Sequence, residues 1–241
     1  TILITMHYSS IFIEKLLNYY DNQSLFEVIL VDSTKDAINF KIPDFVNHLK
    51  VPNDTVFSEK MHQAISAVRT KYVVWNADDD FYSFDAIVSG INFLNDNTDY
   101  NSFYGQTIIY DGKFSIYTTK SYSINQTNPT QRLKYGFKNY DNRLNSVMRS
   151  SDALNFYELY CSNFKTPSFT FEFANAFYFL KKGKVKYSST PFIFRRRVEN
   201  SAGNVEFNYL KFWTENKYLK EKNSFIKLLA HKEKVRENLI A

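Results

Sequence analysis

The sequence predicts an α/β fold built on a mostly parallel sheet with helices on its faces. Short apolar runs typical of buried strands alternate with segments whose apolar residues recur at helical spacing. This order favours a parallel sheet, because a helix returns the chain to the point where the next parallel strand begins. We expect strands over residues 2–6, 26–31 and 72–75, and helices over residues 13–20, 58–70 and 83–95.

Local signals support each of these elements. Ser9 or Ser10 can cap the first helix. The strand over 26–31 ends at Asp32, and a polar loop with Pro43 and Pro52 follows it. The inward positions of the first two helices keep helical spacing; they are Ile13, Leu16, Leu17 and Tyr20, then Met61, Ala64, Ile65 and Val68.

Beyond residue 100 the pattern becomes less regular. Two short runs, 106–110 and 113–117, flank Asp111-Gly112, which is typical of a two-residue hairpin turn. Residues 118–143 are polar and weakly periodic, which predicts a lid or binding loop. We expect a short strand over 145–148, helices over 152–161 and 168–180, and strands over 184–187 and 192–194.

The last part of the chain differs in composition. We predict one domain over residues 1–200 and a helical C-terminal extension over residues 201–241. The extension is rich in lysine and aromatic residues, among them Phe212, Trp213, Lys217, Tyr218 and Lys220. Its apolar spacing favours a helix that packs on the domain. Contact with a partner domain or a membrane surface is the alternative.

Composition excludes several classes of protein. The 241 residues carry a formal charge of +5, which suits anionic substrates but is too small to indicate nucleic acid. Cys161 is the only cysteine, so no intrachain disulfide forms, and we expect a cytoplasmic protein. We see no signal peptide or membrane span, and a start at Thr1 inside a strand predicts a processed chain or a piece of a larger protein. A phosphate-binding glycine loop, a nucleophile elbow and zinc-ligand spacing are absent from the sequence.

Three consecutive carboxylates, Asp78-Asp79-Asp80, follow the third expected strand. Like charges in a row repel one another, so a fold avoids them unless a cation or positive groups gather there. In an extended segment alternate side chains face the same side, so we expect Asp78 and Asp80 to point together. Two such carboxylates suit Mg²⁺ or Mn²⁺, which keep positions for water and substrate phosphates. The alternative is an acidic loop in which Asp80 caps the next helix.

Ligands of parallel sheets bind beyond the carboxyl ends of the strands. Residues 7–9, Asp32 and residues 78–80 all lie at such ends, so we expect three segments to converge on one crevice. A carboxylate at Asp32 can accept hydrogen bonds from a base N–H or a ribose hydroxyl. The alternative is an Asx turn that closes the strand.

Two cations are candidates for binding an anionic ligand. Lys60 lies in the first turn of its helix, where the helix dipole disfavours a cation, so an anion nearby is expected. Arg195 belongs to the run Arg195-Arg196-Arg197, and guanidinium groups bind phosphate well. A solvated lysine and a solvated basic turn are the alternatives. Arg143 and Arg149 are weaker candidates of the same kind.

Glu172 is the candidate general base. It is a lone carboxylate in an aromatic stretch over residues 168–174, and such a group can deprotonate an acceptor hydroxyl. The alternative is a glutamate placed in the first helical turn by the helix dipole. Asp141 and Asp152 are rival bases.

These residues resemble the GT-A class of nucleotide-sugar glycosyltransferases, especially the bacterial family-two-like enzymes that build surface polysaccharides. The resemblance covers about residues 1–200 and is carried by the opening strand, the strand that ends at Asp32, and the segment from Glu59-Lys60-Met61 to Asp80. Residues 171–195 also resemble the back half of that group. The chain departs from the usual pattern at residues 6–9, and it lacks typical Glu-Asp and Gln-Arg-Arg-Trp-like acceptor motifs.

The resemblance implies a role for each site residue. Asp32 would contact the nucleoside, Asp78 the ribose or the metal, and Asp80 the metal, while Glu172 would be the base of an inverting displacement. We therefore predict a transferase that uses Mn²⁺ or Mg²⁺ to move a sugar from a nucleotide donor, most often a UDP-sugar, to a hydroxyl. The acceptor would be a glycan or lipid-linked glycan, and the protein would act in the cytoplasm, including at the inner face of the membrane. A nucleotidyltransferase that releases pyrophosphate and a non-catalytic glycan-binding module are the alternatives.

Overall fold

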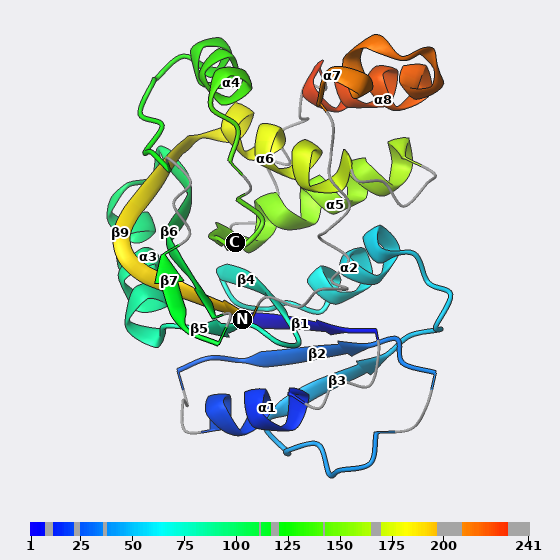
Figure 1. Ribbon diagram of the computed structural model, residues 1–241, viewed down its shortest axis with the longest axis vertical. Helices are drawn as coiled ribbons and strands as arrows, with labels where there is room; N and C mark the ends of the chain where they lie inside the picture. The colour runs from blue at the N-terminus through cyan, green and yellow to red at the C-terminus, as the bar shows by residue number, and fades with distance from the viewer. Residues whose placement is uncertain are drawn as a thin grey trace, which may run out of the picture.

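The structure is a computed structural model that describes residues 1–7, 12–21, 25–35, 38–110, 112–116, 121–141, 143–164, 170–196 and 209–230. It is an α/β fold in which helices cover both faces of one curved sheet (Figure 1). The strand order is β3-β2-β1-β4-β8-β6-β9-β5, and β7 pairs with β6. The predicted α/β class is confirmed.

The first half of the sheet is parallel. It contains β1 (Ile2–Met6), β2 (Val28–Asp32), β3 (Val46–Lys50) and β4 (Tyr72–Ala77). β1 and β2 are buried along their whole length, as expected of strands covered on both faces. The polar loop expected between Pro43 and Pro52 contains β3. That strand was missed because it lies at the sheet edge and is largely exposed, so its sequence is half polar.

The second half of the sheet is mixed. It contains β5 (Phe81–Tyr82), β6 (Tyr100–Tyr110), β7 (Phe114–Ile116), β8 (Val147–Arg149) and β9 (Lys184–Arg196). β8 is antiparallel to both β4 and β6, whereas β6 and β9 are parallel. The mostly parallel sheet predicted from the sequence is therefore limited to the first half.

β9 is one long strand where the sequence predicted two short ones. Its register against β6 shifts between Ser188 and Pro191. Proline cannot donate to the ladder, so an irregularity at this point is expected. The predicted hairpin is present as the β6–β7 pair, and Gly112 has a φ of 70°. Asp111 lies outside the described residues.

Helices α1 (Ile13–Asp21) and α3 (Phe84–Asp96) bury apolar side chains against one face of the sheet. Helices α2 (Phe57–Ser66), α5 (Ser150–Asn163) and α6 (Thr170–Lys182) do so on the other face. All five were predicted, with ends moved by a few residues. The proposed caps of α1 at residues 9 and 10 lie outside the described residues.

Helix α4 (Pro129–Lys138) lies inside the segment predicted to be a long loop. Asn128 caps it by accepting hydrogen bonds from the backbone N–H groups of Thr130 and Gln131. Pro129 occupies its first turn, where the missing N–H costs nothing. These start signals were overlooked because the helix is polar and its apolar periodicity is weak.

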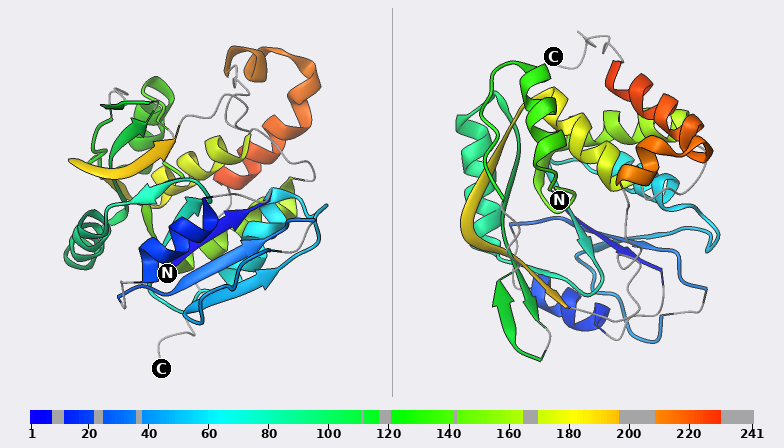
Figure 2. Two further views of the ribbon diagram at one scale, coloured as in Figure 1. Left: turned by 60° about the horizontal axis from the view of Figure 1, so that its bottom comes forward. Right: turned by 45° about the horizontal axis from the view of Figure 1, so that its top comes forward.

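The C-terminal segment forms α7 (Tyr209–Thr214), a 3-10 turn (Asn216–Tyr218) and α8 (Leu219–Ala230). Phe212, Phe225 and Leu228 are buried in the same core as α5 and α6, and Figure 2 shows α8 beside these helices. The described part of the extension is therefore a packing element, as favoured from its apolar spacing. The boundary at residue 200 falls outside the described residues. Within the described chain, every helix is too short or too polar to cross a membrane.

Candidate active site

The carboxyl ends of three parallel strands meet at one edge of the sheet. In the register of the sheet, Met6 of β1 pairs with Asp32 of β2, and Thr5 pairs with Ala77 of β4. Asp32 therefore lies beside the end of β1, while the carboxylate run begins just beyond β4 on its other side. The predicted convergence of these segments is confirmed for the described residues. Residues 8 and 9 lie outside them.

The carboxylate run forms a turn and not an extended segment. Asp78 and Asp79 occupy the turn, and the Asp80 N–H bonds the carbonyl oxygen of Ala77 at 3.5 Å. The alternation argument that paired Asp78 with Asp80 is thus wrong for this backbone. The capping alternative is also wrong, because the N-cap of α3 is Ser83, whose side chain accepts from the backbone N–H of Ala86.

Asp80 is tied to Arg195 from the end of β9. Its side chain is buried, and its Oδ2 accepts a hydrogen bond from Arg195 Nε at 3.1 Å. Burial nevertheless raises the pKa of Asp80 to about 6, and the neighbouring Arg195 only partly opposes this. The predicted cation Arg195 therefore lies at the carboxylate turn. Arg196 also lies at the turn, where its charge acts on Asp79 and its guanidinium contacts the ring of Phe12. Arg197 lies outside the described residues.

The pKa of Asp78 is raised further than that of Asp80. Burial raises the pKa of Asp78 to about 7, and the adjacent Asp79 adds to the effect, while Lys60 acts in the opposite direction. Burial also raises the pKa of Asp79, opposed by Arg195 and Arg196. The nearby positive groups in the described chain do not bring the pKa values of Asp78 and Asp79 back to the ordinary range. An added cation would therefore stabilise the ionised carboxylates.

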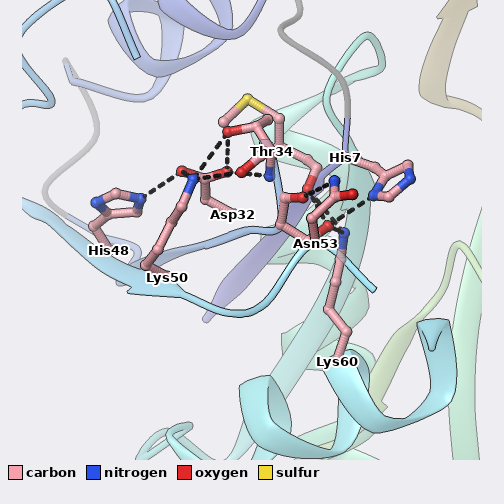
Figure 3. A network of polar contacts seen from close by, with 9 residues as sticks. His7, Asp32, Thr34, His48, Lys50, Asn53 and Lys60 are labelled. Carbon is pink, nitrogen blue, oxygen red and sulfur yellow. Dashed lines mark hydrogen bonds and ion pairs between the residues drawn. The ribbon is translucent and has the colours of Figure 1, made fainter. Parts of the chain in front are cut away.

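Lys60 reaches the ends of β1 and β2 (Figure 3), and its charge also acts on Asp78 of the carboxylate turn. Its buried ammonium group donates to the carbonyl oxygen of Met6 and to Ser33 Oγ, both at 2.8 Å. Burial lowers its pKa to about 8, and the charges of Asp78 and Asp32 oppose this decrease. The alternative of a solvated lysine is therefore wrong. Contact with an anionic ligand stays a prediction.

Asp32 is the centre of a hydrogen-bond network (Figure 3). Its Oδ1 accepts from the backbone N–H of Thr34 at 2.7 Å and from the Thr34 hydroxyl at 2.6 Å. Its Oδ2 accepts from His48 Nε2 at 3.1 Å and from Lys50 Nζ at 3.0 Å. Burial favours a higher pKa for Asp32, but these hydrogen bonds outweigh it and lower the pKa.

The observed contacts of Asp32 all lie within the protein, so its predicted contact with a nucleoside stays untested. The Asx-type turn, which was the alternative for Asp32, is present at Thr34. The contribution of β3 to the contacts of Asp32 was not predicted. His48 and Lys50 come from β3, and Lys50 pairs in register with Asp32. Their spacing of two residues between Pro43 and Pro52 was the available signal for a polar strand end.

Glu172 lies in the first turn of α6 with an exposed side chain. Its surroundings still raise the pKa of Glu172 by partial desolvation, and Arg195 acts in the opposite direction. Burial alone would lower the pKa of Arg195. The interactions with Asp80, Tyr82 and Glu172 outweigh burial, so the pKa of Arg195 is raised. Arg195 therefore joins the carboxylate turn and Glu172 electrostatically. The roles of Glu172 as base and of Asp78 and Asp80 as metal ligands stay predictions.

Two weaker candidates lie elsewhere. Asp152 pairs with Lys182 at 3.2 Å and accepts from Asn101 Nδ2 at 2.6 Å, near the start of β6 and so at the opposite edge of the sheet. Arg149 donates to the carbonyl oxygens of Leu94 and Tyr100, also at that edge. Both residues hold the fold together and cannot reach the carboxylate turn.

The fold and the site define a GT-A-class protein: a carboxylate turn, a buried lysine and an arginine meet where parallel strands end. Residues 3–157 match the family model described as glycosyl transferase family 2. The chain therefore belongs to glycosyl transferase family 2, and the resemblance predicted from its sequence is confirmed. No curated protein matches the chain.

Solved structures of S. aureus TarS share the fold. TarS 1–349 in complex with UDP-GlcNAc superposes with a TM-score of 0.63 at 12% identity, over 95% of this chain and 64% of that one. TarS 1–349 alone gives 0.60 at 11% identity, over 81% of this chain and 59% of that one. The longer TarS structure superposes with a TM-score of 0.58 at 12% identity, over 81% of this chain and 36% of that one. This chain thus spans about three-fifths of the TarS 1–349 structures.

Proposed function

We propose that this protein transfers a sugar from a nucleoside diphosphate donor, a UDP-sugar, to a hydroxyl of a glycan or lipid-linked glycan in bacterial surface polysaccharide synthesis. One observation carries the proposal. Three consecutive carboxylates, the half-buried Asp78 and Asp79 and the buried Asp80, form a turn beside Lys60 and Arg195, at the edge where α/β sheets bind nucleotides. Family membership and the TarS complexes with UDP-GlcNAc and UDP support the choice of donor.

The donor set fits a divalent cation. In the described chain, no three His, Cys, Asp or Glu side chains are grouped so that they could hold a metal by themselves. Mg²⁺ and Mn²⁺ do not need such a cage, because they take one or two carboxylates and complete their shell with water and substrate phosphates. Asp78 and Asp80 would hold the ion. When bound, it would offset the charge that develops on the departing diphosphate.

Lys60 and Arg195 both supply positive charge beside the turn. Lys60 Nζ uses two of its three donors in the described contacts, both to oxygens at the ends of β1 and β2. The third donor is available to a phosphate or ribose oxygen. Arg195 holds Asp80 in place by its Nε–H and leaves its other donors for a phosphate.

Glu172 acts as the general base of an inverting displacement. It removes the proton of the acceptor hydroxyl as the acceptor oxygen bonds the anomeric carbon. The bond from that carbon to the phosphate oxygen breaks at the same time, and the nucleoside diphosphate leaves with the electron pair. A carboxylate with a raised pKa is a stronger base than one in water, which suits this task.

The experiment combines binding and product analysis. A thermal-shift series of nucleoside diphosphates, with Mn²⁺ or with chelator, should give its largest rise for UDP with Mn²⁺. Asp80→Asn should fold but lose transfer by at least about 10²-fold, because it removes a charge that acts on the leaving diphosphate. The products should be UDP and a glycosylated acceptor. Full activity of Asp80→Asn, or pyrophosphate among the products, would contradict the proposal.

A further inference from the structure

Among the residues that the structure describes, two arginines are almost completely buried, Arg132 at 4% exposure and Arg143 at 3%. The side-chain N–H groups of Arg132 donate hydrogen bonds within the protein. They bond backbone carbonyl oxygens around the start of α4 and the end of α6 at 2.6–2.9 Å, namely those of Gln126, Thr127, Leu180 and Lys181. A buried guanidinium satisfied in this way is a structural clamp.

Arg143 is different. Its Nε and Nη1 atoms are buried and have no hydrogen-bond partner among the described residues, although its guanidinium also interacts with the Tyr104 hydroxyl. Among the described residues, no carboxylate lies within ion-pair distance of it. Its guanidinium lies over the ring of Tyr104, with 5.9 Å between Cζ and the ring centroid. Buried charged donors without partners are costly, so they are kept where a ligand supplies the partner.

Arg143 lies on the side of the sheet that carries the active site. β8 runs antiparallel to β4, with Met148 opposite Val73. Upstream of β8, Asn145 donates to the carbonyl oxygen of Trp75 at 3.4 Å. Trp75 precedes Asp78 by three residues in the sequence. The chain that leads from β8 back to Arg143 therefore runs towards the carboxylate turn.

The acid closest to Arg143 in the sequence is already engaged. Asp141 Oδ2 accepts from the Tyr104 hydroxyl at 3.0 Å and from Ser121 Oγ at 2.6 Å. The ring of Tyr187 lies 5.3 Å from that of Tyr104. The Tyr104 hydroxyl thus interacts with both Asp141 and Arg143, and the Tyr104 ring lies between Arg143 and Tyr187 in this chain of contacts. These provide the apolar faces and directional polar groups that small-molecule sites use.

We propose that Arg143 forms an anion subsite beside the donor site, and that it binds a carboxylate or phosphate group carried by a sugar substrate. The naming of a sugar substrate rests on the proposed function, whereas the anion subsite rests on the geometry of Arg143. A guanidinium recognises carboxylate and phosphate oxygens by charge and by directed N–H groups. A neutral sugar leaves this buried charge unpaired, so the subsite selects against it.

Thermal stability tests whether the fold or a ligand uses Arg143. Arg143→Met should leave the melting temperature of the ligand-free protein unchanged or higher, because it removes a buried charge that lacks partners. Arg132→Met is the matched control, and it should lower the melting temperature by about 5 °C or more, because it leaves carbonyl oxygens unpaired. An equal loss for the two variants, or failure of Arg143→Met to fold, would show that the fold needs Arg143 and would overturn the proposal.

Anion binding supplies the second readout. Calorimetry with inorganic phosphate and with free glucuronate should show binding to the wild-type protein and about tenfold to hundredfold weaker binding to Arg143→Met. Arg143→Lys should lie between the two. Equal affinities in the wild type and Arg143→Met would overturn the subsite. The thermal shift by UDP with Mn²⁺ reports on the proposed function separately, and Arg143→Met should not change it.

A comparison of charged and neutral substrates shows whether the donor or the acceptor carries the anion. If the donor carries it, UDP-glucuronate should bind more tightly than UDP-glucose to the wild type but not to Arg143→Met. If the acceptor carries it, the same difference should appear between a phosphorylated and a neutral oligosaccharide. Either pattern supports the subsite. The absence of both contradicts a role in substrate selection.

Discussion

Replacing Asp78 with asparagine should stabilise this protein in the absence of metal. The folded protein holds the Asp78 proton up to a pKa of about 7, whereas the carboxyl group ordinarily loses it near 3.8. Between these values the folded state binds more protons than the unfolded state. The free energy of unfolding therefore falls as pH rises from about 4 to about 7, and the penalty is complete above that range.

The size of the effect follows from the two pKa values. They differ by about 3, and each pKa unit corresponds to about 1.4 kcal/mol, which sets a ceiling of about 4 kcal/mol. The Asp78 side chain is partly exposed, so solvent screening reduces this figure. We expect a gain of about 2 kcal/mol for Asp78→Asn at pH 8, which corresponds to a rise of about 4–8 °C in melting temperature.

The assay is thermal unfolding of the wild type, Asp78→Asn and Asp54→Asn at pH 5 and pH 8 in chelator. Asp54 is an exposed aspartate in the turn that follows β3, so its variant controls for the loss of a surface charge. The gain of Asp78→Asn over this control should be larger at pH 8 than at pH 5. Addition of Mn²⁺ with UDP should then stabilise the wild type more than Asp78→Asn.

Two results would refute the reasoning. The first is a melting temperature of Asp78→Asn at or below that of the control at pH 8, because Asp78 would then carry no charge penalty. The second is an equal gain from Mn²⁺ and UDP in both proteins, because the surplus charge would then have nothing to do with a cation.

The remaining predictions concern the reaction. Glu172→Gln should lower kcat by about 10²- to 10⁴-fold with an unchanged Kd for UDP, because it removes only the base. The control Asp152→Asn, at the opposite edge of the sheet, should leave kcat near wild type, and the reverse ranking would assign the base elsewhere. The affinity for UDP with Mn²⁺ should increase as pH rises through about 7, where Asp78 loses its proton, and decrease above about 8, where Lys60 loses its charge. Calorimetry across this range tests both steps, and a flat profile would contradict the roles of the two residues.

The sequence located more of the site than of the surrounding sheet. The apolar run over residues 72–75 and the carboxylates after it are local signals, so the strand end and its acidic turn could be predicted. The edge strand β3 was missed because its polar residues carry no apolar run, although His48 and Lys50 bond Asp32. Helix α4 was missed because it is polar, although Asn128 and Pro129 mark its start, and because Arg132 fastens it to α6 through backbone carbonyl groups rather than an apolar face.

The sequence alone determined the α/β class and the placement of Asp32 and residues 78–80 at the ends of parallel strands. Chain order and local periodicity encode these features, because each strand or helix buries a face set by its own residues. Only the tertiary structure decided which charges meet. Asp80 and Arg195 are 115 residues apart, and they pair because β9 crosses the sheet to β5. The same long-range packing places Arg143 over the ring of Tyr104, and its Nε and Nη1 atoms have no partner among the described residues.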